Sequence, residues 1–247
     1  MWKKWTLSFL ALALCVFLGS AVPAEAAAKE KPARVELVMV LDKSGSMSGL
    51  ESDTIGGFNG MIAQHKGDGG DVLVSTVLFD HEDEVIHDRV RIAEVPTLTD
   101  KEYYTRGSTA LLDAMGGAIH HIRNVHKYAR PEDRPARTMF IITTDGMENA
   151  STRYTADQVR AMVKKQEKEA GWEFVFLGAN IDAVQVAGGL GIRAENAVEF
   201  ACDAAGVREN FASLSRMTCA FSHTGIIGAG WKTKISEHLA KRKSGRS

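Results

Sequence analysis

The sequence predicts an α/β fold in which a doubly wound, mostly parallel sheet carries helices on both faces. The first observation is a set of short, almost wholly apolar segments, which is typical of strands buried on both faces. The second is that segments with apolar residues at helical spacing lie between them. This alternation indicates a covered parallel sheet of the Rossmann-like kind. The apolar segments are 35–42, 72–80, 137–145 and 172–180.

The first half of the chain predicts a strand, a helix and a hairpin. A helix over about 50–66 follows the first strand, although its glycines oppose helix formation. The strands 72–80 and 85–92 are separated only by the polar segment HEDE, which is short enough for an antiparallel hairpin. The sheet should therefore have one antiparallel edge strand. The inward stripe of the helix holds Ile55, Phe58 and Ile62.

The second half predicts the remaining helices and strands. A helix begins after a loop that ends near Gly107, and another begins with a T-x-x-Q capping box at Thr155 and Gln158 and stops at Gly171. A short helix over about 183–189, a strand over 197–201 and a helix over about 204–218 complete the set. The inward residues of the helix after Gly107 are Leu111, Leu112, Met115, Ile119 and Ile122.

The N-terminal residues predict a secretory signal. A charged start precedes the apolar stretch 5–18, and Ala24 and Ala26 then occupy A-x-A positions. The stretch is short for a membrane span, so we expect cleavage after residue 26; an uncleaved membrane anchor is the alternative. We therefore expect an exported protein, in the periplasm, on the cell surface or in the medium. The expected parts are a signal at 1–26, a domain at 33–221 and a basic tail at 222–247.

The charge balance gives no sign of a nucleic-acid partner. Lys and Arg number 30 against 31 Asp and Glu, so the net charge is −1. The basic tail places Trp231, Ile235 and Leu239 at spacing that allows a short amphipathic helix. After signal removal two cysteines remain, Cys202 and Cys219, and both a bridge and two free thiols are open. Neither these cysteines nor the histidines show the spacing of a zinc site.

Oxygen side chains follow two of the most apolar strands. Asp42 and Asp145 each end such a strand, and carboxyl ends of neighbouring parallel strands meet at one crevice. Ser44 and Ser46 lie on the loop after the first strand, and Thr109 begins a helix. Two carboxylates and three hydroxyls are hard donors that suit Mg²⁺ or Mn²⁺, and they are too few for a calcium cage. Such an ion would stay short of anionic ligands, so a partner carboxylate could complete its shell.

These residues resemble a known family. "DKSGS", the Thr of "GST" and the Asp of "TTDG" resemble the metal-ion-dependent adhesion site (MIDAS) of von Willebrand factor type A (VWA) domains. The resemblance covers about 35–218, and "STALLDA", "TTDGMENAS" and "FLGANIDA" are similar to stand-alone bacterial members. It implies metal-dependent protein–protein interaction or adhesion, with an acidic partner residue on the ion. It also implies that the metal ligands are Asp42, Ser44, Ser46, Thr109 and Asp145, with the acids acting partly through water.

Two other functions stay open at this point. Metal-dependent phosphohydrolases also place an Asp after the first strand, but they need a second acid two residues on, where this chain has Ser44. We therefore expect no enzyme. A structural module with a vestigial metal site is the other alternative, in which the aspartates cap strands and the serines form turns. Glu148 and Asn149, just after Asp145, are either part of the site or ordinary loop residues.

Overall fold

A six-stranded sheet forms the centre of the computed structural model, which describes residues 33–245. Its strand order is β3-β2-β1-β4-β5-β6, and among the described strands only β3, at the edge, runs antiparallel to its neighbour. The prediction of a doubly wound sheet with one antiparallel edge strand is confirmed. The predicted signal, residues 1–26, lies outside the described residues. The strands are β1 (Val35–Asp42), β2 (Val72–Phe79), β3 (Asp83–Arg91), β4 (Arg137–Thr144), β5 (Glu173–Ala179) and β6 (Ala197–Phe200).

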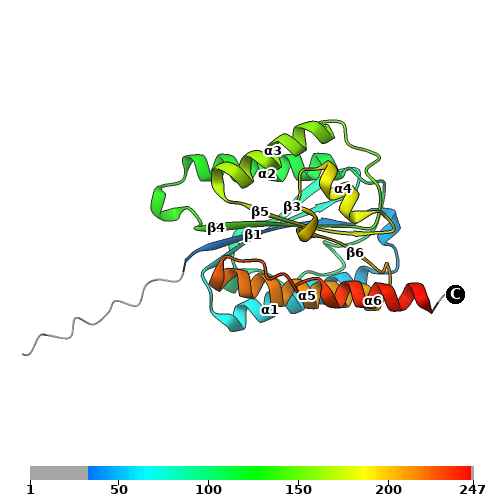
Figure 1. Cartoon of the computed structure of the whole chain (residues 1–247). Helices are drawn as coiled ribbons and strands as arrows, with labels where there is room; N and C mark the ends of the chain where they lie inside the picture. Colours follow the sequence, from blue (N-terminus) through cyan, green and yellow to red (C-terminus); the bar gives the residue numbers. More distant parts are fainter. Residues whose placement is uncertain (1–32, 246–247) are drawn as a thin grey trace, which may run out of the picture. The chain divides into compact units, whose positions relative to one another are not determined.

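The helices cover both faces of the sheet. Figure 1 shows α2, α3 and α4 on one face and α1, α5 and α6 on the other. The predicted capping box is confirmed, because the Thr155 side chain accepts from the Gln158 amide and the Gln158 side chain accepts from the Thr155 amide. The helices are α1 (Glu51–Asp68), α2 (Leu111–Tyr128), α3 (Ala156–Ala170), α4 (Ala183–Gly189), α5 (Ala204–Thr224) and α6 (Thr233–Ser244).

Strand β1 is buried on both of its faces, as its apolar sequence predicts. Successive side chains of a strand point to opposite faces. Leu37, Met39 and Leu41 therefore join the core beneath α1 and α5, and Val38 and Val40 join the core beneath α2 and α3. Packing on both faces thus fixes the position of β1, and its last residue, Asp42, lies at the carboxyl edge of the sheet.

The glycines of α1 are explained in part by close helix packing. A Cβ atom on Gly57 would lie 2.3 Å from Cδ2 of Phe211 on α5, so a glycine lets the two helices approach. Gly56, Gly60 and Gly67, the other glycines of α1, have nothing within 4 Å of such an atom. One glycine of the four therefore serves packing, and the other three only weaken the helix.

The predicted basic tail contains a helix that packs on the sheet edge. Helix α5 continues across residue 221, and α6 buries Ile235 in the core. The Trp231 indole donates to the Glu195 carbonyl, and Lys232 Nζ donates to the carbonyls of Ala194 and Ala197 beside β6. This agrees in part with the predicted amphipathic helix, because Ile235 and Leu239 lie in α6 but Trp231 precedes its first residue, Thr233. The domain boundary itself stays a prediction. Within residues 33–245, no helix combines the length and apolar character that crossing a membrane requires.

Candidate metal centre

Three loops at the carboxyl edge of the sheet bring the predicted oxygen residues together. The first leaves β1 at Asp42, and the second precedes α2 and contains Thr109. The third leaves β4 at Asp145, and β4 lies beside β1 in parallel register, with Leu41 opposite Thr143. We call the five residues at this point the candidate metal centre. They are Asp42, Ser44, Ser46, Thr109 and Asp145.

The hydroxyls and one carboxylate of the centre are in mutual contact. Ser46 Oγ lies 3.0 Å from Ser44 Oγ and donates to Asp145 Oδ1 at 2.5 Å. A Cβ atom added to Gly146 would lie 3.3 Å from Thr109 Oγ1 and 3.4 Å from Ser46 Oγ, so both hydroxyls border the same space. A side chain at position 146 would fill that space. Four oxygen side chains from three loops therefore face one small region.

Asp42 is held by hydrogen bonds on both carboxylate oxygens. Oδ1 accepts from the Ser44 amide at 2.7 Å, and Oδ2 accepts from the Thr144 hydroxyl at 2.6 Å. Burial raises the pKa of Asp42 above its ordinary value; these hydrogen bonds oppose the rise, and the nearby charge of Asp145 adds to it. A divalent cation beside the two carboxylates would relieve their repulsion. The electrostatics of the pair therefore suit a cation.

The loop before α2 is shaped by glycine and by an asparagine. Gly107 has φ +67°, and a Cβ atom there would lie 2.2 Å from His81 Nδ1, so no other residue fits without a shift. The Gly107 carbonyl accepts from the Gly45 amide at 3.1 Å, which joins the first two loops. The Thr109 amide donates to Asn149 Oδ1 at 2.9 Å, and the Asn149 amide donates to the Thr109 carbonyl at 3.0 Å. Asn149 therefore joins the second and third loops.

Glu148 supports the third loop through hydrogen bonds on both of its oxygens. Oε1 accepts from the amides of Ala150 and Ser151, and Oε2 accepts from the Leu112 amide at the start of α2 and from the Ser151 hydroxyl. Of the two roles left open for Glu148, these contacts fit the loop role. An acidic residue bonded to a helix N-terminus is also electrostatically favourable.

Asp113, which the sequence analysis does not single out, anchors the same loop. Its carboxylate accepts from the amides of Thr152, Arg153 and Tyr154. Burial would raise the pKa of Asp113, but these three hydrogen bonds lower it below its ordinary value. An acid in the first turn of a predicted helix was the available signal, but nothing local shows that it bonds residues about 40 positions ahead.

Two further side chains reach the centre from distant segments. The buried Tyr103 hydroxyl donates to the Asp42 carbonyl at 2.6 Å. Cys202, just after β6, donates through Sγ to Asp145 Oδ2 at 3.5 Å. Burial, together with the charge of Asp145, raises the pKa of Cys202 to about 11, so the thiol stays protonated as a donor. Cys202 and Cys219 are both free thiols.

The donor set fits a small, hard divalent ion. Among residues 33–245, no group of three or more His, Cys, Asp or Glu side chains gathers as a metal cluster, so the centre relies on hydroxyls. Hydroxyl and carboxylate oxygens are the ligands that Mg²⁺ and Mn²⁺ accept. Lys43, which lies between Asp42 and Ser44 in the sequence, directs its ammonium to Glu84 at 3.0 Å. Lys43, the cationic side chain nearest to the proposed ligands in the sequence, is therefore already paired with a carboxylate.

Comparisons with known proteins give a fold. No family model and no curated protein matches the chain. It is similar to the PilB minor pilin from Streptococcus sanguinis at 10% identity (TM-score 0.55), covering 77% of this chain and 62% of that one. It is similar to the vWF domain of the pilus tip protein Mfa5 from Porphyromonas gingivalis at 14% identity (TM-score 0.55), covering 80% and 99%.

A third similar structure is the open conformation of the pilus adhesin SpaC from Lactobacillus rhamnosus GG. The identity is 14% and the TM-score 0.57, with coverage of 76% of this chain and 30% of that one. The chain thus spans less than two thirds of PilB and of SpaC but almost all of the Mfa5 domain. At these identities the similarity concerns the backbone arrangement, and the chain has the fold of von Willebrand factor type A domains.

Proposed function

We propose that the protein binds Mg²⁺ or Mn²⁺ at the candidate metal centre and uses the ion to bind an acidic side chain of a protein partner. The observation that carries this proposal is the convergence of Ser44, Ser46 and Asp145, whose oxygens are 2.5–3.0 Å apart along the chain of contacts. Thr109 borders the same space from the second loop. Oxygen side chains from three loops thus border one space, as a metal site requires.

The composition of the donor set supports capture of a carboxylate. Three of its five side chains are neutral hydroxyls, so they offset little of a divalent charge. A bound ion would supply positive charge at the carboxyl edge of the sheet, where an acidic side chain could approach it. Ser46 is an exposed residue, and Met147, two residues after Asp145, is 69% exposed, so the edge is open to a macromolecule.

The proposal places the protein outside the cytoplasm. Its first basis is the predicted secretory signal at 1–26. Its second basis is that the similar structures are described as a minor pilin, a pilus tip protein and a pilus adhesin. Both bases favour a protein ligand on a cell surface or in the periplasm.

Binding is favoured over catalysis by the contacts of the two acids. Both oxygens of Asp42 accept hydrogen bonds, and Asp145 accepts one bond on each oxygen, from Ser46 and from Cys202. In this proposal both carboxylates serve the ion, which leaves neither as a free base or nucleophile, and position 44 holds a serine where a phosphohydrolase needs an acid. The proposed function is therefore that of a binding module.

The test is isothermal titration calorimetry of residues 27–247 with MgCl₂ and MnCl₂. We expect binding by the wild type, and a loss of about tenfold or more in affinity for Ser46→Ala and Asp145→Asn, because each removes a donor oxygen. Ser48→Ala is the matched control, since Ser48 is exposed in the same loop and its amide, not its side chain, bonds Gly45. Absence of divalent binding by the folded wild type would refute the proposal.

Partner capture is tested separately. Wild type and Asp42→Ala are used as baits for the exported fraction of the source cell, with Mg²⁺ and with EDTA. We expect a protein that is retained only by metal-loaded wild type and is released by a soluble acidic peptide. Equal retention in all arms would show that the metal centre is not the contact.

A further inference from the structure

The turn between β2 and β3 is acidic and faces all three loops of the candidate metal centre. Together with the first two residues of β3, Asp83 and Glu84, it reads DHEDE over 80–84, and we call these five residues the acidic turn. None of its carboxylates belongs to the proposed ligand set. Each of them instead pairs with a cation that one of the three loops supplies. The cations are Lys43, Arg106 and Arg153.

In the first loop the acidic turn holds Lys43, which lies between Asp42 and Ser44. Lys43 Nζ is 3.0 Å from Glu84 Oε2, and the Lys43 side chain is only 1% exposed. A buried ammonium needs a partner, because an unpaired charge away from water is costly. The Lys43 amide also donates to the Phe79 carbonyl at the end of β2, at 2.7 Å. The first loop is thus attached to the hairpin by backbone and by charge.

In the second loop the acidic turn holds Arg106, three residues before Thr109. Arg106 Nε donates to Asp80 Oδ2 at 2.7 Å, and its Nη2 donates to Glu82 Oε2 at 3.2 Å. Asp80 is fully buried, and its carbonyl accepts from the Ala110 amide at 2.7 Å. The segment that contains Thr109 is therefore bound to the acidic turn on both sides.

In the third loop the acidic turn holds Arg153. Arg153 pairs with Asp83 of the turn and lies 3.5 Å from Asp113 on α2. The amide of Arg153 also bonds Asp113, so this end of the loop is attached to the helix. The charge pair with Asp83 adds the attachment to the hairpin.

We propose that the acidic turn is an electrostatic clamp that sets the metal affinity of the centre without supplying a ligand. This proposal rests on the proposed function and has two parts. The clamp holds the three loops in place before an ion binds, and it neutralises three cations that would otherwise repel a divalent ion. Exposed ion pairs alone contribute little. Here the Lys43 member of the Lys43–Glu84 pair and the Asp80 member of the Arg106–Asp80 pair are buried. Losing the partner of a buried charge is costly, so these two pairs matter more than exposed ones.

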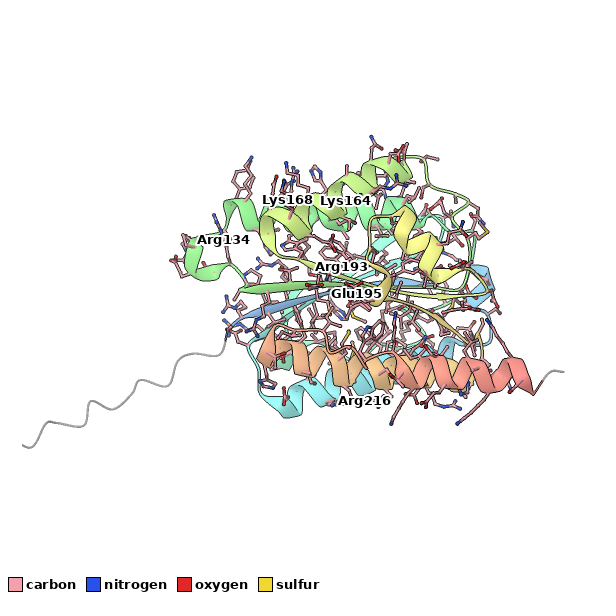
Figure 2. The ribbon with its side chains drawn as sticks, in the orientation of Figure 1. Arg134, Lys164, Lys168, Arg193, Glu195 and Arg216 are labelled. Atoms are coloured by element: carbon pink, nitrogen blue, oxygen red, sulfur yellow. The ribbon has the colours of Figure 1, made fainter. Side chains whose placement is uncertain are left out.

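The experiment replaces single acids of the turn by their amides. Glu84→Gln and Asp83→Asn remove one charge each from the first and third attachments. The matched control is Asp133→Asn, whose partner Arg130 lies 2.7 Å away. Figure 2 shows the neighbouring Arg134 at the amino end of β4, and the centre lies at the carboxyl end of that strand. Each protein is measured by Mg²⁺ calorimetry, by denaturant unfolding and, without metal, by amide hydrogen exchange.

We expect Glu84→Gln and Asp83→Asn to weaken Mg²⁺ binding by about fivefold or more, with the control unchanged. In the metal-free variants, exchange should accelerate in the attached loop, over 43–49 for Glu84→Gln and 146–153 for Asp83→Asn. The free energy of global unfolding should stay near that of the wild type. The double variant Lys43→Met/Glu84→Gln should recover affinity relative to Glu84→Gln, because it removes the unpaired cation together with its partner.

Three results would overturn the clamp. One is wild-type affinity and wild-type loop exchange in both single variants. Another is exchange that rises through the whole domain with an equal loss of global stability, which would make the turn a general part of the fold. No recovery in the double variant would overturn the neutralising part. If the wild type binds no Mg²⁺, the proposed function fails and the effect on affinity with it, while the exchange comparison still decides whether the turn holds the loops.

Discussion

Replacing single glycines of α1 by alanine tests how tightly this helix packs on α5. At Gly57 an added Cβ atom would lie 2.3 Å from Cδ2, 2.5 Å from Cγ and 2.8 Å from Cβ of Phe211. Rotating the ring cannot relieve the contact, because the Phe211 Cβ atom is itself too close. The two helices would have to separate locally. At Gly60, in the same helix, an added Cβ atom meets nothing within 4 Å.

The expected magnitudes follow from two opposing effects. Alanine is favoured over glycine in a helix interior by about 1 kcal/mol, so Gly60→Ala should stabilise the protein by about 0.5–1 kcal/mol. The same gain applies to Gly57→Ala, but overpacking a close contact costs about 1–3 kcal/mol. Gly57→Ala should therefore be less stable than Gly60→Ala by about 1–3 kcal/mol. For a chain of this size, each kcal/mol corresponds to about 2–4 °C in Tm.

The assay is urea unfolding followed by circular dichroism, with the Tm measured in parallel. Both variants change one glycine to alanine in one helix, so differences in the unfolded chain largely cancel. If Gly57→Ala were as stable as Gly60→Ala, α1 and α5 would not approach as closely as the Gly57 contact requires. The explanation for the glycine-rich sequence of α1 would then be wrong.

Three further predictions concern polar side chains that are buried or half-buried. His65 is buried, with Nε2 2.8 Å from Thr218 Oγ1, and burial lowers its pKa, so the unfolded state binds the proton more readily. The free energy of unfolding should therefore fall as the pH drops below about 6.5. His65→Gln should flatten that decline when it is measured by urea unfolding. Thr144→Val keeps the shape of the side chain but removes the hydroxyl that donates to buried Asp42 at 2.6 Å. It should lower the free energy of unfolding of the metal-free protein by about 1.5–3 kcal/mol. Unchanged stability in urea unfolding would contradict this. Desolvation of the half-buried Cys202 thiol, together with the charge of Asp145, raises its pKa to about 11. Alkylation at pH 8, followed by mass spectrometry, should therefore be about 100-fold slower in native than in unfolded protein; equal rates would disprove the shift.

The strands and helices could be predicted because their signals are local. Apolar runs and helical spacing act over a few residues, and the capping box of α3 involves positions three apart. The short polar link after β2 is equally local, and it predicts the antiparallel edge strand. The glycines of α1 were ambiguous for the opposite reason. Only the approach of Phe211, more than 150 positions ahead, separates Gly57 from Gly60.

The candidate metal centre was predictable in its residues but not in its supports. Asp42, Ser44 and Ser46 form one local pattern, and Asp145 ends a second apolar strand. The order of strands then places β1 beside β4, so the two patterns meet. Cys202 reaches Asp145 across 57 positions, a contact that no spacing indicates.

By itself, the sequence determined the alternation of strands and helices, the strand-end aspartates and the oxygen donors around them. The tertiary structure alone decided which side chains hold those donors in place. It paired the acidic turn at 80–84 with cations from three loops and packed α6 against β6. The physical reason is the distance along the chain over which each interaction is decided. Backbone conformation follows from the nearest few residues, whereas a charge or a thiol takes whichever partner the sheet order brings beside it.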